Sequence, residues 1–215
     1  DALLEDLVGD LIDRGPDSKG VIDYLLSRPA GFDRMVFLKG NHEDMLLSFL
    51  GLAGQHGDVF LLNGGKPTIE SYGILTAKPT GSELAQRMPA EHLDFFRELR
   101  PYYVMAPYLC VHAGVQPGKT LEEQSETELL WIRNPFIYHP HRLPYTVIFG
   151  HTPQNEVFLD LPYKIGLDTG LVYGNLLSCL DTDEKILYQI KRGKKSVKQV
   201  SLQKRWESRS PGWMP

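Results

Sequence analysis

The chain has 215 residues, of which 42% are hydrophobic and 23% are charged, so its size and composition are those of one large globular domain. Two cysteines without CxxC spacing exclude a disulfide-rich secreted domain and a structural zinc finger, and they favour a reducing, cytoplasmic compartment. No apolar segment approaches the roughly 18 residues of a membrane span, and the first residues do not resemble a signal peptide. We therefore expect a cytoplasmic protein without a membrane anchor.

The net charge of −4 is distributed unevenly along the chain. Residues 1–190 hold 15 Lys and Arg against 26 Asp and Glu, whereas residues 191–215 hold 8 against 1. We therefore divide the chain into a body, residues 1–190, and a basic C-terminal strand or tail, residues 191–215. We interpret the basic segment as an exposed edge strand whose lysines discourage pairing with other chains. The alternative is a surface that contacts nucleic acid or an acidic partner.

Short apolar runs alternate with amphipathic stretches along the body, a pattern typical of an α/β fold. Strands are expected at residues 35–38, 108–111, 145–149, 164–167, 175–180 and 186–190. Helices are expected at residues 1–8, 21–26, 44–50 and 93–99, the second of them capped by Asp17 or Ser18. The glycine-rich segment 51–65 is interpreted as an inserted loop.

Four short segments beside these strand ends carry residues suited to metal or phosphate chemistry: residues 10–15, residues 41–43, His112 and His151. Ligands of open α/β sheets gather at the carboxyl ends of strands, so we expect one common site. Glycines flank each segment and permit tight turns and a close approach of the backbone.

The candidate metal ligands offer oxygen and nitrogen donors without a thiolate: Asp10, Asn41, His112 and His151. Such a set suits manganese, iron or zinc. Arg14 and Arg133 add guanidinium forks that match phosphate oxygens, with a surface ion pair as the less favoured alternative for Arg133. Together with a spare histidine, His42, this combination indicates metal-assisted hydrolysis of a phosphate ester by two metal ions.

Two other phosphate-binding signatures are excluded by their spacing. A cysteine phosphatase needs an arginine six residues after its nucleophile, and Gln116 and Lys185 stand at those places. A P-loop needs a glycine five residues before its Gly-Lys pair, and Phe60 stands there instead.

Residues 9–15 (GDLIDRG), 40–43 (GNHE), 112–114 (HAG) and 150–152 (GHT) resemble, in order and spacing, the signature series of the PPP-type metallophosphatases within the calcineurin-like phosphoesterase superfamily. Residues 63–65 (NGG), 71–73 (SYG) and 168–170 (DTG) further resemble its bacterial serine/threonine protein phosphatase branch. The resemblance covers the chain from residue 9 to about residue 180, and Asp168 has an equally good interpretation as a structural turn residue.

The resemblance implies an α/β fold with a two-sheet β-sandwich flanked by helices and a dinuclear metal site at the strand ends. It implies that Asp10 bridges both metals and that Asn41, His112 and His151 complete the shell of the second metal. It also implies that His42 is the general acid that protonates the leaving oxygen, oriented by Asp13, which raises its pKa.

Arg14 and Arg133 would hold the non-bridging phosphate oxygens and stabilise charge in the transition state. The implied reaction is hydrolysis of phosphomonoesters, above all phosphoserine and phosphothreonine on proteins, by metal-bound hydroxide. We expect two divalent ions, manganese in vitro with iron or zinc as alternatives, and a phosphoprotein or phosphopeptide as the partner. No membrane or nucleic-acid partner is expected, and the oligomeric state is left open.

Two alternatives stay open beside this interpretation. One is a symmetrical dinucleoside-polyphosphate hydrolase of the Ap4A type, which shares the fold and metals but whose branch lacks the aspartate found here at Asp13. The other is a non-catalytic pseudophosphatase that binds phosphoproteins. It is suggested by the missing Gly-Asp-x-His-Gly segment, whose Asp and His hold the first metal in the family. Because a helix at residues 1–8 would run straight into Gly9, we expect residues to be absent upstream and between Leu7 and Gly9.

Overall fold

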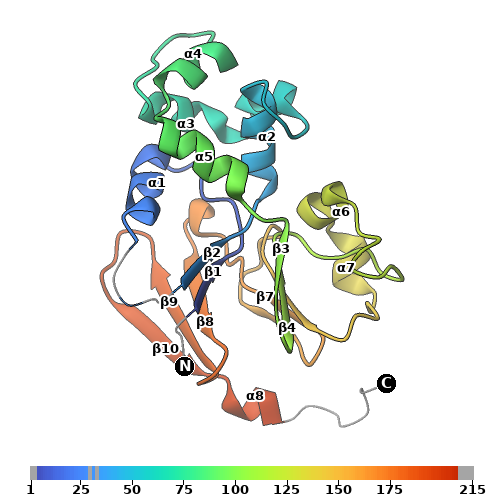
Figure 1. The fold of residues 1–215 in the computed structure, drawn as a ribbon. Helices are drawn as coiled ribbons and strands as arrows, with labels where there is room; N and C mark the ends of the chain where they lie inside the picture. The colour runs from blue at the N-terminus through green and yellow to red at the C-terminus, as the bar shows by residue number, and fades with distance from the viewer. Residues whose placement is uncertain (1–3, 29–30, 32–33, 208–215) are drawn as a thin grey trace. The chain divides into compact units, whose positions relative to one another are not determined.

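The computed structural model describes residues 4–28, 31 and 34–207, and it divides the chain into two compact units, Asp1–Tyr102 and Tyr103–Pro215. Helices and strands are present in both units, so the predicted α/β class is confirmed (Figure 1). Within the described ranges, no helix is both long and apolar enough to cross a membrane. The division at residue 190 that the charge suggested and the role of the basic segment both stay predictions.

The first unit contains a parallel pair of strands, β1 (Leu4–Leu7) and β2 (Arg34–Phe37). The predicted helix at residues 1–8 is therefore wrong over residues 4–7, and residues 1–3 lie outside the described residues. The spacing of the leucines suits a helix, but backbone pairing with β2 decides the conformation, because strand formation depends strongly on tertiary context. The loop that begins at Gly9 thus follows a strand.

The first unit also contains the helices α1 (Ser18–Leu26), α2 (Asn41–Phe49), α3 (Lys66–Ser71), α4 (Gly81–Arg87) and α5 (Ala90–Glu98). Helix α1 begins as predicted, because the Asp17 carboxylate accepts a hydrogen bond from the Gly20 N–H at 2.9 Å. Its inner face buries Ile22 and Leu25, and both α3 and α5 contact α1. Helix α2 begins at Asn41, three residues before the predicted start, so residues 41–43 belong to its first turn.

The segment 51–65, expected to be an inserted loop, is irregular over residues 51–56 and helical over most of the rest. It forms a 3₁₀ turn, η1 (Gly57–Val59), and a π turn, η2 (Leu61–Gly65). Phe60 between them is fully buried, and a Cβ added at Gly65 would lie 2.6 Å from its ring, so the glycine is needed for this close packing.

The second unit contains two sheets, as predicted, with helices against one of them. The five-stranded sheet has the order β3-β4-β5-β7-β6, with β3 (Tyr102–Met105) at the boundary of the units, β4 (Tyr108–Val111), β5 (Thr146–Phe149), β7 (Lys164–Gly166) and β6 (Phe158–Asp160). Strands β4, β5 and β7 are parallel, and every residue of β4 and β5 is buried, which explains their uninterrupted apolar sequences.

Two short helices, α6 (Glu126–Trp131) and α7 (Asn134–Tyr138), pack on this sheet (Figure 1). The Ala113 N–H donates to the Leu129 carbonyl at 2.9 Å, which attaches α6 just after β4. The ring centroids of Phe136 in α7 and Phe149 in β5 lie 5.0 Å apart, edge to face. The helices therefore fix the segments that follow β4 and precede β5.

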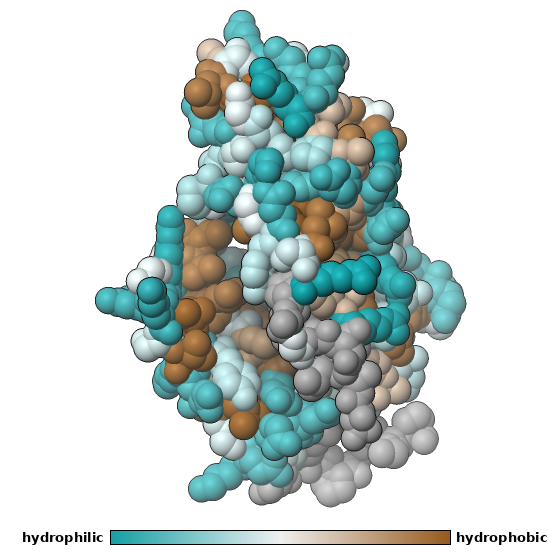
Figure 2. Space-filling model, turned by 60° about the vertical axis from the view of Figure 1, so that its left-hand side comes forward, coloured by the Kyte–Doolittle hydropathy of each residue, from teal (hydrophilic) through white to brown (hydrophobic). Residues whose placement is uncertain are grey.

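The other sheet is antiparallel, with the order β10-β9-β8, and it follows the turn η3 (Leu171–Tyr173). Its strands are β8 (Leu176–Asp181), β9 (Ile186–Lys191) and β10 (Val197–Ser201), and a short helix α8 (Gln203–Glu207) comes next. Strand β10 lies at an edge of this sheet, and residues 191–199 are exposed. Leu177 and Val197 are 54% and 53% exposed, and Figure 2 shows hydrophobic side chains lying at the surface between hydrophilic ones.

Candidate functional site

The buried carboxylate of Glu43 fastens the loop after β1 to the start of α2. Its Oε1 accepts a hydrogen bond from the Leu11 N–H at 2.6 Å, and its Oε2 accepts from the N–H groups of Asp10 at 3.0 Å and Gly40 at 2.8 Å. Burial, together with the charge of Asp10, raises the pKa of Glu43 to about 7. We assigned no role to Glu43 from the sequence, although a glutamate three residues after a helix N-cap is a capping signal.

The loop held by Glu43 has a strained backbone. Asp10, Asp13 and Arg14 have φ angles of 56°, 71° and 60°, in the left-handed region that residues other than glycine rarely occupy. The loop also approaches Gly40 closely, since a Cβ there would lie 2.5 Å from Asp10 Oδ1 and 2.6 Å from Asp10 N. Such strain typically marks functional loops, and here it sets the direction of the Asp10 and Asp13 side chains.

Asp13 and His42 form a buried pair. Asp13 Oδ2 lies 2.6 Å from His42 Nδ1, and the two residues are 5% and 3% exposed. Burial raises the pKa of Asp13 against the opposing effect of His42. Burial alone would lower the pKa of His42, but the hydrogen bond with Asp13 and the charge of Asp10 raise it overall. Nδ1 is therefore held on Asp13, and Nε2 is the nitrogen that can exchange a proton with a ligand.

Asn41 precedes His42 as the first residue of α2 and is also buried. Its amide oxygen is a ligand of the kind that divalent cations accept. The early start of α2, which Glu43 stabilises, therefore brings Asn41 and His42 to one helix end.

Arg14 is fixed through its backbone and exposes its side chain. Its N–H donates to the Gly64 carbonyl at 3.0 Å. Gly64 has a φ of 101°, and a Cβ there would lie 2.7 Å from Arg14 Cγ. The segment 63–65, which we noted from the family resemblance, thus lies directly against this arginine.

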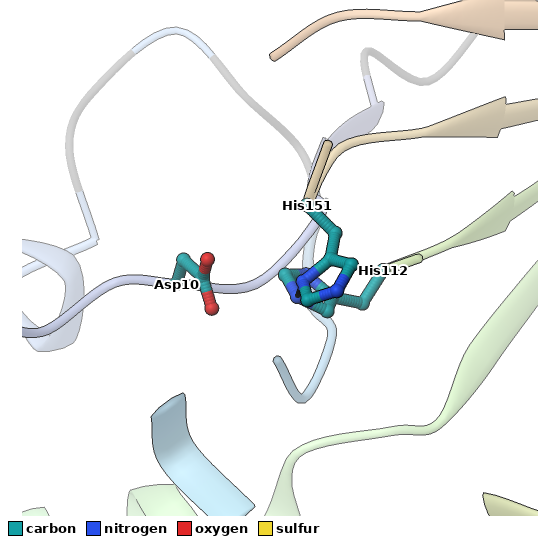
Figure 3. A group of neighbouring side chains, drawn as sticks. All are labelled: Asp10, His112 and His151. Atoms are coloured by element: carbon teal, nitrogen blue, oxygen red, sulfur yellow. Dashed lines mark hydrogen bonds between the residues drawn. The ribbon is translucent and has the colours of Figure 1, made fainter. Parts of the chain in front are cut away.

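In the second unit, His112 directly follows strand β4, and His151 comes two residues after the neighbouring parallel strand β5. The Gly150 N–H donates to the His112 carbonyl at 2.8 Å, which extends the pairing beyond the strands. His112 Nε2 and His151 Nδ1 lie 3.2 Å apart, and both residues are buried (Figure 3). Two imidazole nitrogens that face each other this closely in a buried place suit a shared cation.

Arg133, at the start of α7, contacts the segment that carries His151. Its Nη1 donates to the His151 carbonyl at 3.0 Å and to Thr152 Oγ1 at 3.4 Å. Within the part of the chain that the structure describes, the Arg133 guanidinium thus donates to two oxygens that follow β5 and not to a carboxylate. His151 itself has a φ of 63°, so it too is held in a strained conformation.

Asp168 has a structural role in the described fold. Its Oδ1 accepts a hydrogen bond from the Gly170 N–H at 2.9 Å, and its carbonyl accepts from the Gln154 N–H at 2.9 Å. These bonds shape the turn after β7 and agree with the structural interpretation of the DTG segment.

The sequence-predicted residues are therefore divided between the two units, and the residues from each unit are named below as a cluster. The first cluster is Asp10, Asp13, Arg14, Asn41 and His42. The second cluster is His112, Arg133 and His151. The catalytic and ligand roles given to these residues stay predictions.

Comparison with known proteins gives these clusters a context. The sequence profile of the calcineurin-like phosphoesterases matches residues 5–174. Serine/threonine-protein phosphatase 1 of Salmonella typhimurium is 31% identical over 178 residues, which cover 80% of this chain and 74% of that protein. An asymmetrical bis(5'-nucleosyl)-tetraphosphatase of Anoxybacillus flavithermus is 25% identical over 190 residues, which cover 80% of this chain and 73% of that protein.

A solved structure described as that of a candidate diadenosine tetraphosphatase has a similar fold. Its TM-score is 0.58 at 23% sequence identity, and the match covers 91% of this chain and 78% of that one. At this identity the likeness concerns the fold alone.

Proposed function

Because the chain belongs to the calcineurin-like phosphoesterase family and is therefore a metal-dependent phosphoesterase, we propose a narrower activity for it, the hydrolysis of phosphoserine and phosphothreonine on proteins. The observation that carries this proposal is the buried hydrogen bond between Asp13 and His42. A serine or threonine alkoxide is a strongly basic leaving group, so its departure needs a proton from a positioned acid. The phosphatase of Salmonella typhimurium among the relatives supports the same substrate class.

The donor set fits the divalent metals that the family implies. A carboxylate, an amide oxygen and two imidazoles suit manganese, iron or zinc, and the facing rings of the second unit supply two nitrogens. We infer that the ligands are Asp10, Asn41, His112 and His151, with manganese as the expected ion in vitro. When bound, two metal ions stabilise the negative charge of the phosphate and make a water molecule more acidic.

The chain's own residues have distinct parts in the proposed reaction. Arg14 and Arg133 bind the non-bridging oxygens of the phosphate, for which guanidinium groups have matching geometry. As a water oxygen bonds to phosphorus, the ester bond breaks, and the leaving oxygen takes the electron pair of that bond and the proton on His42 Nε2. Asp13 keeps the imidazole oriented through Nδ1.

A second candidate function is the hydrolysis of dinucleoside polyphosphates, which the tetraphosphatase of Anoxybacillus flavithermus suggests. There the leaving group is a phosphate of low basicity, which departs without strong protonation, so the Asp13–His42 pair would be less useful. The third candidate is a pseudophosphatase that binds phosphoproteins without turnover. In our proposal the partner is a phosphoprotein or phosphopeptide, and nucleic acid has no part.

The protein purified with Mn²⁺ should hydrolyse para-nitrophenyl phosphate and a phosphoserine peptide, and a chelator should abolish both activities. Phosphate release is measured for these two substrates and for diadenosine tetraphosphate, together with the metal content of the protein. Turnover of diadenosine tetraphosphate but not of the peptide would support the second candidate. Peptide binding without any turnover, in metal-loaded protein, would support the third.

A further inference from the structure

A third side chain acts on the Asp13–His42 pair. Thr68, in α3, is fully buried, and its Oγ1 donates a hydrogen bond to Asp13 Oδ1 at 2.6 Å. The backbone N–H of Asp13 donates in return to Thr68 Oγ1 at 3.0 Å and to Ser18 Oγ at 3.1 Å. Asp13 is thus held by hydroxyl groups from two helices, α3 and α1.

The direction of these hydrogen bonds follows from the number of hydrogens. A hydroxyl group has one hydrogen and two lone pairs, and the hydrogen of Thr68 is used on the Asp13 carboxylate. In the 2.8 Å contact between Ser18 and Thr68, Ser18 is therefore the donor. A continuous chain of donors runs from Ser18 to Thr68 to Asp13, and each bond polarises the next.

Both oxygens of the Asp13 carboxylate then have a fixed partner. Oδ1 accepts from Thr68, and Oδ2 lies against His42 Nδ1, each at 2.6 Å. Two partners on opposite oxygens stop the carboxylate from rotating about its Cβ–Cγ bond. The plane of the carboxylate, and with it the direction of the imidazole, is therefore set by Thr68.

Thr68 is itself held in place by the packing of α3. Ser71 Oγ accepts a hydrogen bond from the Lys19 N–H at 3.1 Å, which ties α3 to α1. One residue further, the Tyr72 hydroxyl lies 2.8 Å from His92 Nδ1, and His92 Nε2 lies 3.0 Å from Asp23 Oδ1. These contacts, of which the one between Tyr72 and His92 is buried and the others are partly buried, hold α3 against its neighbours and so support the threonine hydroxyl.

We propose that Thr68 is a positioning residue for the proposed general acid: its hydroxyl fixes Asp13 so that His42 Nε2 faces the leaving oxygen. The inference rests on the proton-donating role assigned to His42 above. In the step concerned, a water oxygen bonds to phosphorus and gives up a proton to solvent while the bond between phosphorus and the leaving oxygen breaks. The leaving oxygen keeps the electron pair of that bond, and the Nε2–H bond of His42 is exchanged for a new O–H bond. Thr68 touches neither substrate nor metal ligand in this proposal.

The test compares Thr68→Val, which keeps the shape but removes the hydroxyl, with Thr68→Ser, which keeps the hydroxyl. The kcat and KM of both variants are measured on aryl phosphates of rising leaving-group basicity and on a phosphoserine peptide. For Thr68→Val we expect a loss in kcat that grows with leaving-group basicity and reaches about 10–100-fold, the usual worth of a hydrogen bond to a charged group. KM should change little, and Thr68→Ser should recover most of the lost kcat.

A double-mutant cycle separates positioning from general weakening of the fold. In a His42→Ala background, Thr68→Val should cost almost nothing further, because the group that it positions is already gone. The matched control is Thr146→Val in the second unit, where a buried threonine donates to the Pro162 carbonyl at 2.6 Å. This variant should lower the melting temperature without changing the dependence on leaving-group basicity.

A spectroscopic readout on metal-free protein makes the test independent of activity. The Nδ1 proton of His42 should give a strongly downfield ¹H NMR signal, which persists in Thr68→Ser and moves upfield in Thr68→Val. Ser18→Ala, which removes the donor to Thr68, should move the signal in the same direction by less. If Thr68→Val does not fold, Ser18→Ala and Thr68→Ser decide the question through the same signal.

Unchanged leaving-group dependence in Thr68→Val, or an equal loss with and without His42, would overturn the positioning role. Failure of the proposed function looks different: the unmodified protein would then turn over no phosphomonoester at all. In that case an unshifted His42 signal in Thr68→Val would still reject the inference, and a shifted one would uphold the coupling of Thr68 to His42.

Discussion

In the first unit the candidate residues lie on a loop and at a helix end, whereas in the second unit the two histidines lie at the ends of adjacent parallel strands. The loop is held mainly by the Glu43 carboxylate, which accepts hydrogen bonds from three backbone N–H groups. The hydroxyl groups of Ser18 and Thr68 hold it as well. The histidines are placed by strand pairing, which continues to the bond between Gly150 and His112. A loop site thus needs dedicated buried side chains, while a strand-end site takes its geometry from the sheet.

The difference predicts how each unit responds to mutation, and the largest effect is expected at the strand ends. His112→Ala removes one of two facing imidazoles, so it should lower metal affinity by more than about 100-fold, since losing even an outer-sphere partner costs 10–100-fold. Metal content after dialysis and phosphatase activity should fall together, while circular dichroism stays that of the unmodified protein. The control is His141→Gln, which changes another buried histidine of the same unit and should keep the metal. Full metal retention in His112→Ala would remove His112 from the ligand set.

The effect expected in the first unit is confined to the reaction rate, because His42 holds a proton rather than a metal. His42→Ala should lower kcat by roughly 10²–10⁴-fold, the range for the loss of a general acid, with the metal content unchanged. Steady-state kinetics and metal analysis of the same preparation measure both quantities. The comparison between the units would break down if His42→Ala lost its metal as His112→Ala does, or kept its full rate.

The smallest effect concerns stability against pH in the second unit. His141 is buried, its Nε2 donates to the Tyr163 carbonyl at 3.0 Å, and burial together with the Lys164 charge lowers its pKa against the effects of that hydrogen bond and of Asp160. The unfolded chain takes up a proton as the pH falls through the ordinary value of 6.5, whereas the folded chain does not, so folding is weakened on the acid side. The stabilisation is complete above that pH.

Urea unfolding of metal-free protein, with and without His141→Gln, measures this linkage. The free energy of unfolding of the unmodified protein should decline towards that of the variant as the pH is lowered from about 7.5 to about 5.5. Taking the difference between the two proteins removes the contributions of Asp13, Glu43 and His42, whose pKa values are raised. A difference that is constant across this range would show that His141 titrates normally in the folded state.

The sequence predicted those elements whose signal is local. Apolar runs between turn residues located β4 and β5 within one residue, and Asp17 correctly indicated the start of α1. Residues 4–7 were predicted wrongly because their leucines satisfy a helical spacing, and only pairing with β2 makes them a strand. The start of α2 was missed because it depends on the contacts of Glu43 with a loop more than 30 residues away.

The site shows the same limit. Asp10, Asp13 and His42 stand in short motifs with characteristic spacing, so they could be found in the sequence. Thr68 and Ser18 could not, because a single hydroxyl residue carries no pattern and the contact that matters joins positions 50 or 55 residues apart. Hydrophobic periodicity describes which face of an element is buried, but it does not describe which buried polar groups meet.

The left-handed backbone at Asp10, Asp13, Arg14 and His151 has a consequence for how this protein can change. A residue other than glycine in such a conformation costs on the order of 1–3 kcal/mol, least for aspartate, so these four positions withhold stability that glycine would release. Selection for heat resistance alone would drive the chain away from its own candidate site residues. Substitutions that raise the stability of this enzyme must therefore lie elsewhere, such as at surface helix positions and turns. At those positions the residue that is best for folding does not compete with a residue that the chemistry needs.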